Sequence, residues 1–149
     1  GQLVTIGKGE EKLEGALASM AARHPDSIGV KIGFDESVAR CMFAGSDFLL
    51  MPSRFEPCGL SQLYAQRCGS LPVARSCGGL ADTIEDGKTG FLFRNPTVGD
   101  LLQAITRALE AFHSPTRIDK MRRAAMARNF GWKNSAERYS SVLKSVLAT

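Results

Sequence analysis

The sequence predicts an α/β fold: a Rossmann-like, doubly wound parallel sheet with helices on both faces. Short apolar segments alternate with segments of helical periodicity from residue 3 to residue 93. Such alternation is typical of βαβ units, whose strands are parallel. The run FLLM at 48–51 is apolar at every position. A strand of this kind is covered by helices on both of its faces.

The expected elements are separated by turn signals. We expect strands at residues 3–7, 28–32, 48–51, 71–74 and 90–93. We expect helices at 10–23, 36–44 and 60–67, followed by a helical C-terminal tail at 100–112, 116–128 and 134–147. Asp35 is a plausible helix start, since a carboxylate there accepts from the first free N–H groups. We expect residues 77–79 to form a glycine turn.

Length and composition indicate one soluble globular domain over residues 1–149. The chain is 44% hydrophobic, and its apolar runs are far shorter than the roughly 20 residues of a membrane span. The four cysteines form no C-x-x-C pair, and the two histidines lie far apart. This pattern argues against a zinc site and favours reduced thiols in a cytosolic protein. We therefore expect no metal and no membrane partner.

The net charge of +4 raises the question of a nucleic-acid partner. Five basic side chains lie within residues 116–128: Arg117, Lys120, Arg122, Arg123 and Arg128. No aromatic ladder accompanies them, as a platform for single strands would require. A solvated helix face is the favoured interpretation, and no nucleic acid is expected.

Three expected strand ends carry unusual residues, at 33–35, 53–59 and 76–80. Ligands of open α/β sheets bind outside the carboxyl ends of the strands. If the strands are parallel and in register, the three segments share one rim. We expect the binding site there.

The middle segment suits a sugar linked to a diphosphate. Pro57 favours an extended Glu56, so that Glu56 precedes the next helix. Gly59 permits close approach to a ligand, Ser61 adds a hydroxyl, and the helix start offers free N–H groups to an anion. A carboxylate beside an anion site is favourable only if a polar sugar lies between them. The alternative is that Glu56 pairs with Arg54 at the surface.

The other segments carry weaker signals. Gly78 and Gly79 form either a nest of N–H groups for an anion or an ordinary turn. Phe34 either stacks on a base or packs at the edge of the core. Cys58 precedes a helix, where a thiol pKa can fall, but no histidine is near it in sequence. We interpret Cys58 as a neighbour of the site and not as a nucleophile.

These motifs resemble the signatures of bacterial glycogen synthases and plant starch synthases. Residues 52–64, PSRFEPCGLSQLY, are similar to the family's long acidic motif, and residues 78–83, GGLADT, to its second motif. GKTGF at 87–91 and FGW at 130–132 also match in order and approximate spacing. The resemblance extends over nearly the whole chain.

The resemblance implies a retaining glycosyltransferase with two Rossmann-like domains around a cleft. Such enzymes transfer glucose from ADP-glucose or UDP-glucose to the nonreducing end of an α-1,4-glucan, without a cofactor. Glu56 matches the essential acidic residue beside the donor glucose, and Phe34 matches the aromatic residue that stacks on adenine. The predicted nucleotide-sugar-binding residues are Phe34, Cys58, Gly59, Leu60, Ser61, Tyr64, Gly78, Gly79 and Leu80.

The sequence also departs from the family pattern. Related enzymes often have a second Glu eight positions after the first, where this chain has Tyr64. The amino-terminal domain and the first β-α unit of this domain, with its diphosphate-binding Arg and Lys, are not in the chain. We therefore expect the carboxyl-terminal donor domain, with negligible transferase activity alone.

Alternatives remain open at this point. One is another retaining glycosyltransferase that uses a UDP-sugar, and another is a non-catalytic module that binds nucleotide or glucan. The expected location is the bacterial cytoplasm, or the plastid stroma for a plant protein.

Overall fold

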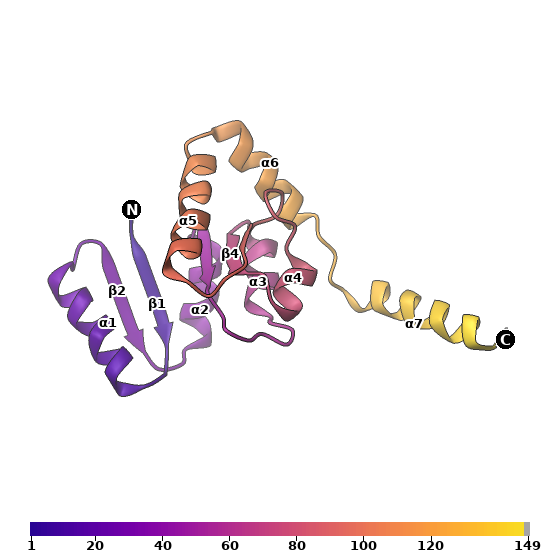
Figure 1. Ribbon diagram of the computed structural model, residues 1–149, viewed down its shortest axis with the longest axis horizontal. Helices are drawn as coiled ribbons and strands as arrows, with labels where there is room; N and C mark the ends of the chain where they lie inside the picture. Colours follow the sequence, from indigo (N-terminus) through magenta and orange to yellow (C-terminus); the bar gives the residue numbers. More distant parts are fainter. Residues whose placement is uncertain (148–149) are drawn as a thin grey trace. The chain divides into compact units, whose positions relative to one another are not determined.

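A computed structural model describes residues 1–147 of the chain (Figure 1). It confirms the α/β class with parallel strands. The chain divides into two compact units, Gly1–Gly45 (unit 1) and Ser46–Thr149 (unit 2). Each is described by itself below, and the expectation of one domain over 1–149 stays a prediction. Within residues 1–147, no helix is long and apolar enough to cross a membrane.

Unit 1 is a two-stranded parallel sheet with two helices. Its elements are β1 (Leu3–Gly7), α1 (Glu11–Arg23), β2 (Ile28–Ile32) and α2 (Glu36–Gly45). The register runs from Leu3 opposite Ile28 to Gly7 opposite Ile32. The predicted helix start is confirmed, because the Asp35 carboxylate accepts a hydrogen bond from the N–H of Val38 at 3.0 Å.

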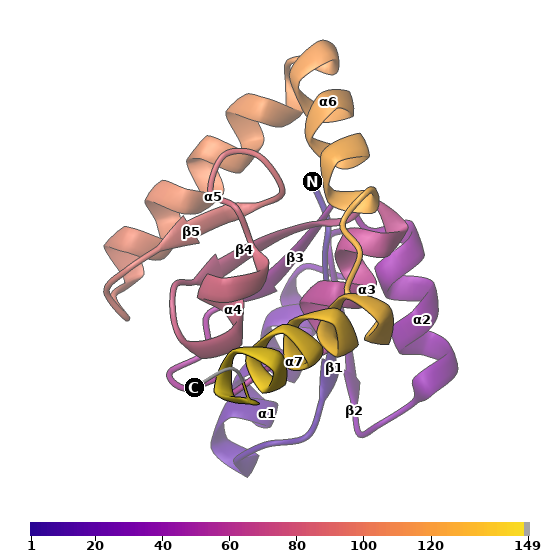
Figure 2. The ribbon, with the colours of Figure 1, turned by 90° about the vertical axis from the view of Figure 1, so that its right-hand side faces the viewer.

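Unit 2 contains the second parallel sheet and the remaining helices. Its elements are β3 (Phe48–Met51), α3 (Ser61–Cys68), β4 (Leu71–Arg75), α4 (Gly78–Thr83), β5 (Phe91–Phe93), α5 (Val98–Phe112), α6 (Pro115–Met126) and α7 (Trp132–Leu147). The strand order is β3-β4-β5, so β4 is central. Helix α5 packs against β4 and β5 (Figure 2).

The core of unit 2 lies on both faces of β4. The all-apolar strand β3, for which the sequence predicted the same cover, has no buried residue, and Leu50 is 39% exposed. Leu71 and Val73 belong to a buried cluster with residues of β5, α5 and α6. Ala74 lies in a second cluster, with Leu80 and Ile84. Successive side chains of a strand point to opposite faces, so helices cover this sheet from both sides. Helix α5 presents buried alanines, which let it approach the sheet closely: Ala104, Ala108 and Ala111.

One sequence expectation is wrong. Residues 77–79 do not form a simple glycine turn, because α4 begins at Gly78, with Cys77 as its N-cap. The N–H of Leu80 donates to the carbonyl oxygen of Cys77 at 3.1 Å, and the Leu80 side chain is fully buried. Burial of Leu80 against Ala74 outweighs the preference of Gly-Gly for a turn.

Candidate functional site

Two loops of unit 2 meet at the carboxyl ends of β3 and β4. We call residues 52–60 the Glu56 loop and residues 76–79 the glycine loop. The N–H of Gly79 donates to the carbonyl oxygen of Glu56 at 3.1 Å. The shared rim is therefore confirmed for these two segments.

Only glycine fits where the loops touch. A Cβ added to Gly79 would lie 2.6 Å from the Cα of Cys58. Gly78 has a φ of +45°, and a Cβ there would collide with the carbonyl oxygen of Glu56. The obstacles are main-chain atoms, which cannot rotate away as a flexible side chain can. The pair Gly78-Gly79 thus serves a close approach of two backbones.

The start of α3 offers a row of free main-chain donors. Leu60 is the N-cap and provides no side-chain cap. Within residues 1–147, the N–H groups of Gly59, Leu60, Ser61 and Gln62 have no hydrogen-bond acceptor. These donors lie at the positive end of the helix dipole. The arrangement is suited to an anion such as a diphosphate.

Glu56 has a half-buried side chain four residues before Leu60. The pairing with Arg54, left open by the sequence, does not occur among the ion pairs of residues 1–147. The carbonyl oxygen of Arg54 instead accepts a hydrogen bond from Arg75 at 2.6 Å. The Glu56 carboxylate therefore remains available to a ligand, while Gly79 holds its main chain.

Arg75, the last residue of β4, was not predicted as a site residue. Its guanidinium donates to the carbonyl oxygens of Arg54 at 2.6 Å, Ser53 at 3.4 Å and Arg94 at 3.1 Å. It thereby fixes the first part of the Glu56 loop and adds positive charge near both loops. An arginine at the end of an otherwise apolar strand was the signal available in the sequence.

The remaining predicted residues of unit 2 differ in accessibility. Cys58 and Leu60 are exposed, and Tyr64 is 55% exposed on the first turns of α3. Ser61 is half-buried at the helix start. The Leu80 side chain lies in the core, so only its main chain can contact a ligand.

Phe34 belongs to unit 1, apart from the two loops. It follows β2 directly and is 86% exposed, so it packs neither in a core nor at its edge. The preceding Gly33 has a φ of +116°, a conformation that favours glycine. The following Asp35 caps α2, so both neighbours hold the main chain around Phe34.

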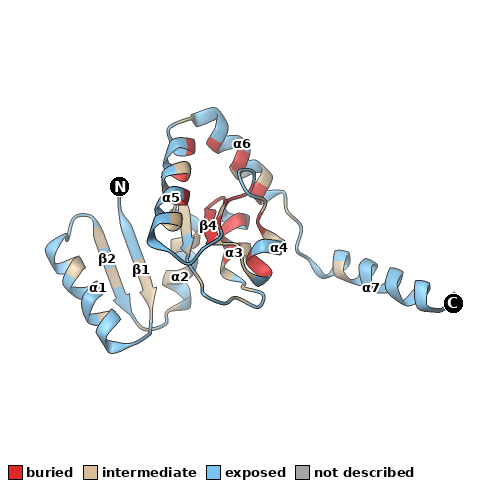
Figure 3. Cartoon of the chain, viewed as in Figure 1, coloured by how far each residue is buried: buried red, intermediate tan, exposed pale blue. Residues whose placement is uncertain are grey.

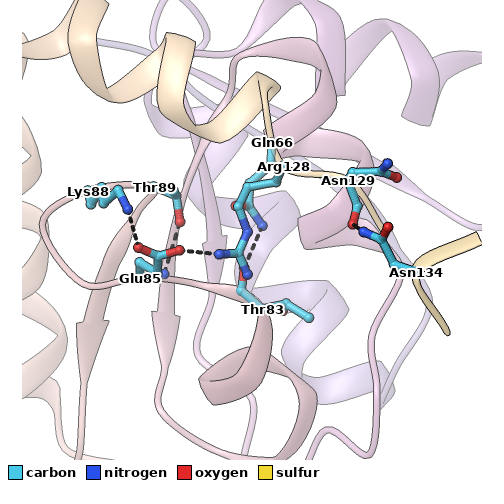
Figure 4. A network of polar contacts seen from close by, with 8 residues as sticks. All are labelled: Gln66, Thr83, Glu85, Lys88, Thr89, Arg128, Asn129 and Asn134. Carbon is cyan, nitrogen blue, oxygen red and sulfur yellow. Dashed lines mark hydrogen bonds and ion pairs between the residues drawn. The ribbon is translucent and has the colours of Figure 1, made fainter. Parts of the chain in front are cut away.

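A network of polar contacts involves α3, the end of α4 and the residues that follow α4 (Figure 4). The buried Gln66 donates to the carbonyl oxygen of Thr83 at 3.2 Å. Glu85 pairs with Lys88 at 2.7 Å and also with Arg128. The hydrogen bond from Lys88 is the largest cause that holds the pKa of Glu85 below its ordinary value of 4.5. The sequence did not predict this network, because Gln66 and Arg128 bond to residues that lie 17 and 43 positions away along the chain.

Residues 1–147 contain no group of three or more His, Cys, Asp or Glu side chains placed to hold a metal ion. All four cysteines are free thiols. The site as it stands consists of main-chain N–H donors, one carboxylate and an adjacent guanidinium.

Comparisons with known proteins identify the family of the chain. The family model described as "Glycosyl transferases group 1" matches residues 1–111. A glycogen synthase of Pseudomonas syringae pv. syringae (strain B728a) is 57% identical over 147 residues, which cover 99% of this chain and 30% of the relative. Glycogen synthase 1 of Bradyrhizobium diazoefficiens is 55% identical over 148 residues, 99% of this chain and 32% of the relative.

A solved structure has a similar fold. It is the catalytic domain of starch synthase IV from Arabidopsis thaliana, bound to ADP and acarbose. It has a TM-score of 0.87 and 26% identity, and the match covers 100% of this chain and 33% of that one. The chain thus spans about a third of the length of these proteins. Because the family model covers residues 1–111, which are most of the chain, the chain belongs to the group 1 glycosyl transferases.

Proposed function

We propose that the chain is the donor-binding part of a glycogen or starch synthase. The reaction is transfer of glucose from ADP-glucose to the nonreducing end of an α-1,4-glucan, with retention at the anomeric carbon. The observation that carries the proposal is the row of four N–H groups at the start of α3 that have no acceptor within residues 1–147. Glu56, whose carboxylate forms no ion pair within the same residues, precedes this row by only three positions. High identity to glycogen synthases supports the choice of substrate.

The two parts of the site match the two charges that the reaction develops. As the glycosidic bond to phosphate breaks, negative charge grows on the diphosphate, which the N–H groups of Gly59, Leu60 and Ser61 stabilise. Positive charge grows on the sugar ring, which the Glu56 carboxylate stabilises. Both groups are held before the substrate arrives, because Gly79 and Arg75 fix the loop by its main chain.

Two exposed aromatic side chains are candidates for recognition of the nucleoside. The exposed Phe34 ring suits stacking on a purine base. Tyr64, which replaces the second Glu of related enzymes, would contact the nucleoside through its exposed ring. Cys58, Gly78 and the main chain of Leu80 would line the phosphate and sugar. The solved starch synthase IV was bound to ADP, which supports ADP-glucose over UDP-glucose as donor.

The acceptor and the rest of the cleft complete the proposal. An α-1,4-glucan would bind against a second, amino-terminal domain, since this chain spans about 30% of its glycogen synthase relatives. Alone, the chain would have negligible transferase activity and would need no metal. The bacterial sources of the high-identity relatives favour the cytoplasm over a plastid.

A chimera tests this function directly. Residues 1–147 replace the matching segment of the Pseudomonas syringae glycogen synthase, and glucose transfer to a maltooligosaccharide is measured with ADP-glucose and with UDP-glucose. We expect turnover with ADP-glucose within about tenfold of the unmodified relative, since the exchanged segments are 57% identical. A preference for UDP-glucose would indicate a different retaining transferase. A folded chimera that binds ADP but transfers nothing would indicate a binding module.

A further inference from the structure

Gln62 is a buried polar residue next to the proposed site. It lies in the first turn of α3 and is completely buried. Its side-chain Nε2 donates to the carbonyl oxygen of Cys58 at 2.9 Å and to that of Gly59 at 3.0 Å. Both partners can only accept, so the orientation of the amide is determined: Nε2 faces the Glu56 loop.

These two hydrogen bonds fix the direction of the free N–H groups. A trans peptide is planar, and its C=O and N–H point to opposite sides. With the carbonyls of Cys58 and Gly59 turned toward Gln62, the N–H groups of Gly59 and Leu60 point away from it. These are two of the donors that have no acceptor within residues 1–147. Gln62 therefore determines where half of the donor row points.

Thr83 connects Gln62 to the glycine loop. Its Oγ1 accepts a hydrogen bond from Gln62 Nε2 at 3.3 Å and donates one to the carbonyl oxygen of Gly79 at 2.5 Å. Gly79 in turn donates to the carbonyl oxygen of Glu56. Gln62 is thus bonded directly to the Glu56 loop and, through the Thr83 hydroxyl, to the glycine loop.

The arrangement costs stability, which argues for a functional reason to keep it. The Oε1 of Gln62 is buried and has no hydrogen-bond partner within residues 1–147. An unpaired buried acceptor is destabilising, and an apolar side chain of equal size would avoid it. Gly59 is adapted to the amide as well, since it has a φ of +71° and a Cβ there would lie 2.9 Å from Nε2.

We propose that Gln62, through its hydrogen bonds and through Thr83, is a positioning residue that aims the N–H groups of Gly59 and Leu60 at the donor diphosphate. This inference rests on the proposed function and extends it to a residue that does not touch the substrate. It predicts a defect specific to the phosphates, because the nucleoside is recognised elsewhere.

The test is Gln62→Met in the chimera, with inhibition by ADP and by adenosine as the readout. Methionine conserves the volume but cannot donate, so the two carbonyls lose their fixed direction. We expect the inhibition constant of ADP to rise about tenfold, as for the loss of one well-placed hydrogen bond, while that of adenosine stays within about twofold.

Gln66→Met is the matched control. Gln66 is equally buried on the same helix, and its Oε1 also lacks a partner within residues 1–147. Its Nε2 donates to the carbonyl oxygens of Gln62 and Thr83, and not to the Glu56 loop. A general loss of packing would affect both variants equally, whereas the proposed role predicts normal ADP inhibition in Gln66→Met.

Thr83→Val provides a second variant if Gln62→Met does not fold. It removes the hydroxyl that joins Gln62 to Gly79. We expect the inhibition constant of ADP to rise about threefold and that of adenosine to stay unchanged. Equal rises of the ADP inhibition constant in Gln62→Met and Gln66→Met would overturn the inference, as would unchanged ADP inhibition in the variants that fold. In either case, glucose transfer by the unsubstituted chimera would still support the proposed function. An unsubstituted chimera that neither binds ADP nor transfers glucose would overturn both.

Discussion

The two units of the chain have the same kind of strand and helix but very different interiors. Every buried hydrophobic residue of the described chain lies in unit 2, and no residue of unit 1 is buried (Figure 3). In unit 2 the central strand β4 is covered on both faces by helices. In unit 1 two strands and two helices leave Val4 56% exposed and Leu13 58% exposed.

The difference bears on how firmly each unit holds its predicted binding residues. The glycine loop follows the buried strand β4, and the N–H of Gly79 holds the main chain of the Glu56 loop. Phe34 extends from a two-stranded sheet, an arrangement that is at best marginally stable on its own. The main chains of the two loops in unit 2 are therefore held more firmly than the two-stranded sheet of unit 1.

Separating the units should give the largest effect. We expect residues 46–147 alone to unfold cooperatively in urea, because the core around β4 is intact. We expect residues 1–45 alone to show no cooperative transition, since they bury no side chain. Circular dichroism during denaturant titration distinguishes the two. A cooperative transition in 1–45, or its absence in 46–147, would contradict the comparison.

Replacing one glycine with alanine in each unit compares how tightly the two units are packed around a single residue. Gly79→Ala places a Cβ 2.6 Å from the Cα of Cys58, so the loops must separate. We expect a loss of about 1–3 kcal/mol in the free energy of unfolding. Gly29→Ala is the control in unit 1, where a new Cβ would lie 3.7 Å from a Val4 side-chain carbon, an ordinary contact. Equal losses in the two variants would show that the loop contact is loose.

We expect a smaller difference between the two units in how their stability depends on pH. Hydrogen bonds from Thr97 and Asn95 hold the pKa of Asp100 in unit 2 below its ordinary value of 3.8. Lys31, and then the N–H of Val38, do the same for the pKa of Asp35 in unit 1. A lowered carboxyl pKa stabilises the fold above the ordinary value, and the contribution is lost as the pH falls through the lowered pKa.

The measurement is urea denaturation of Asp100→Asn and Asp35→Asn at pH 7 and at pH 3. We expect Asp100→Asn to lower the midpoint of the main transition at pH 7 and to differ less from the unsubstituted chain at pH 3. Asp35→Asn should leave that transition unchanged at both pH values, because unit 1 adds nothing to the core. A shift in the main transition by Asp35→Asn would indicate that unit 1 unfolds together with unit 2.

The sequence predicted the elements well because their apolar periodicity is strong. All five strands and the long helices occur within a few residues of the expected bounds. Helix α4 was missed because Gly78-Gly79 has turn propensity, and only the burial of Leu80 in three dimensions overrides it. The long motif predicts Glu56 and the start of α3 as site residues, and that assignment stays a prediction.

The supporting residues could not be predicted from the sequence. Arg75 and Gln62 act by donating hydrogen bonds to main-chain carbonyl oxygens. Every residue has such an oxygen, so the sequence does not indicate which of them is bonded. Their partners are set by how the loops approach each other, which depends on Gly78 and Gly79 having no side chain. The motif therefore marks the groups that would touch the substrate, and the structure adds those that hold them.

The measurement that tests the central claim most directly is the turnover number of the chimera with Glu56→Gln. Glutamine keeps the shape of the side chain and the main-chain bond from Gly79 but removes the negative charge. We predict that kcat falls about 10²–10³-fold, as for the loss of one preorganised charged group, while inhibition by ADP stays nearly unchanged. A kcat within about tenfold of the unsubstituted chimera would contradict the assignment of the sugar-facing carboxylate to Glu56.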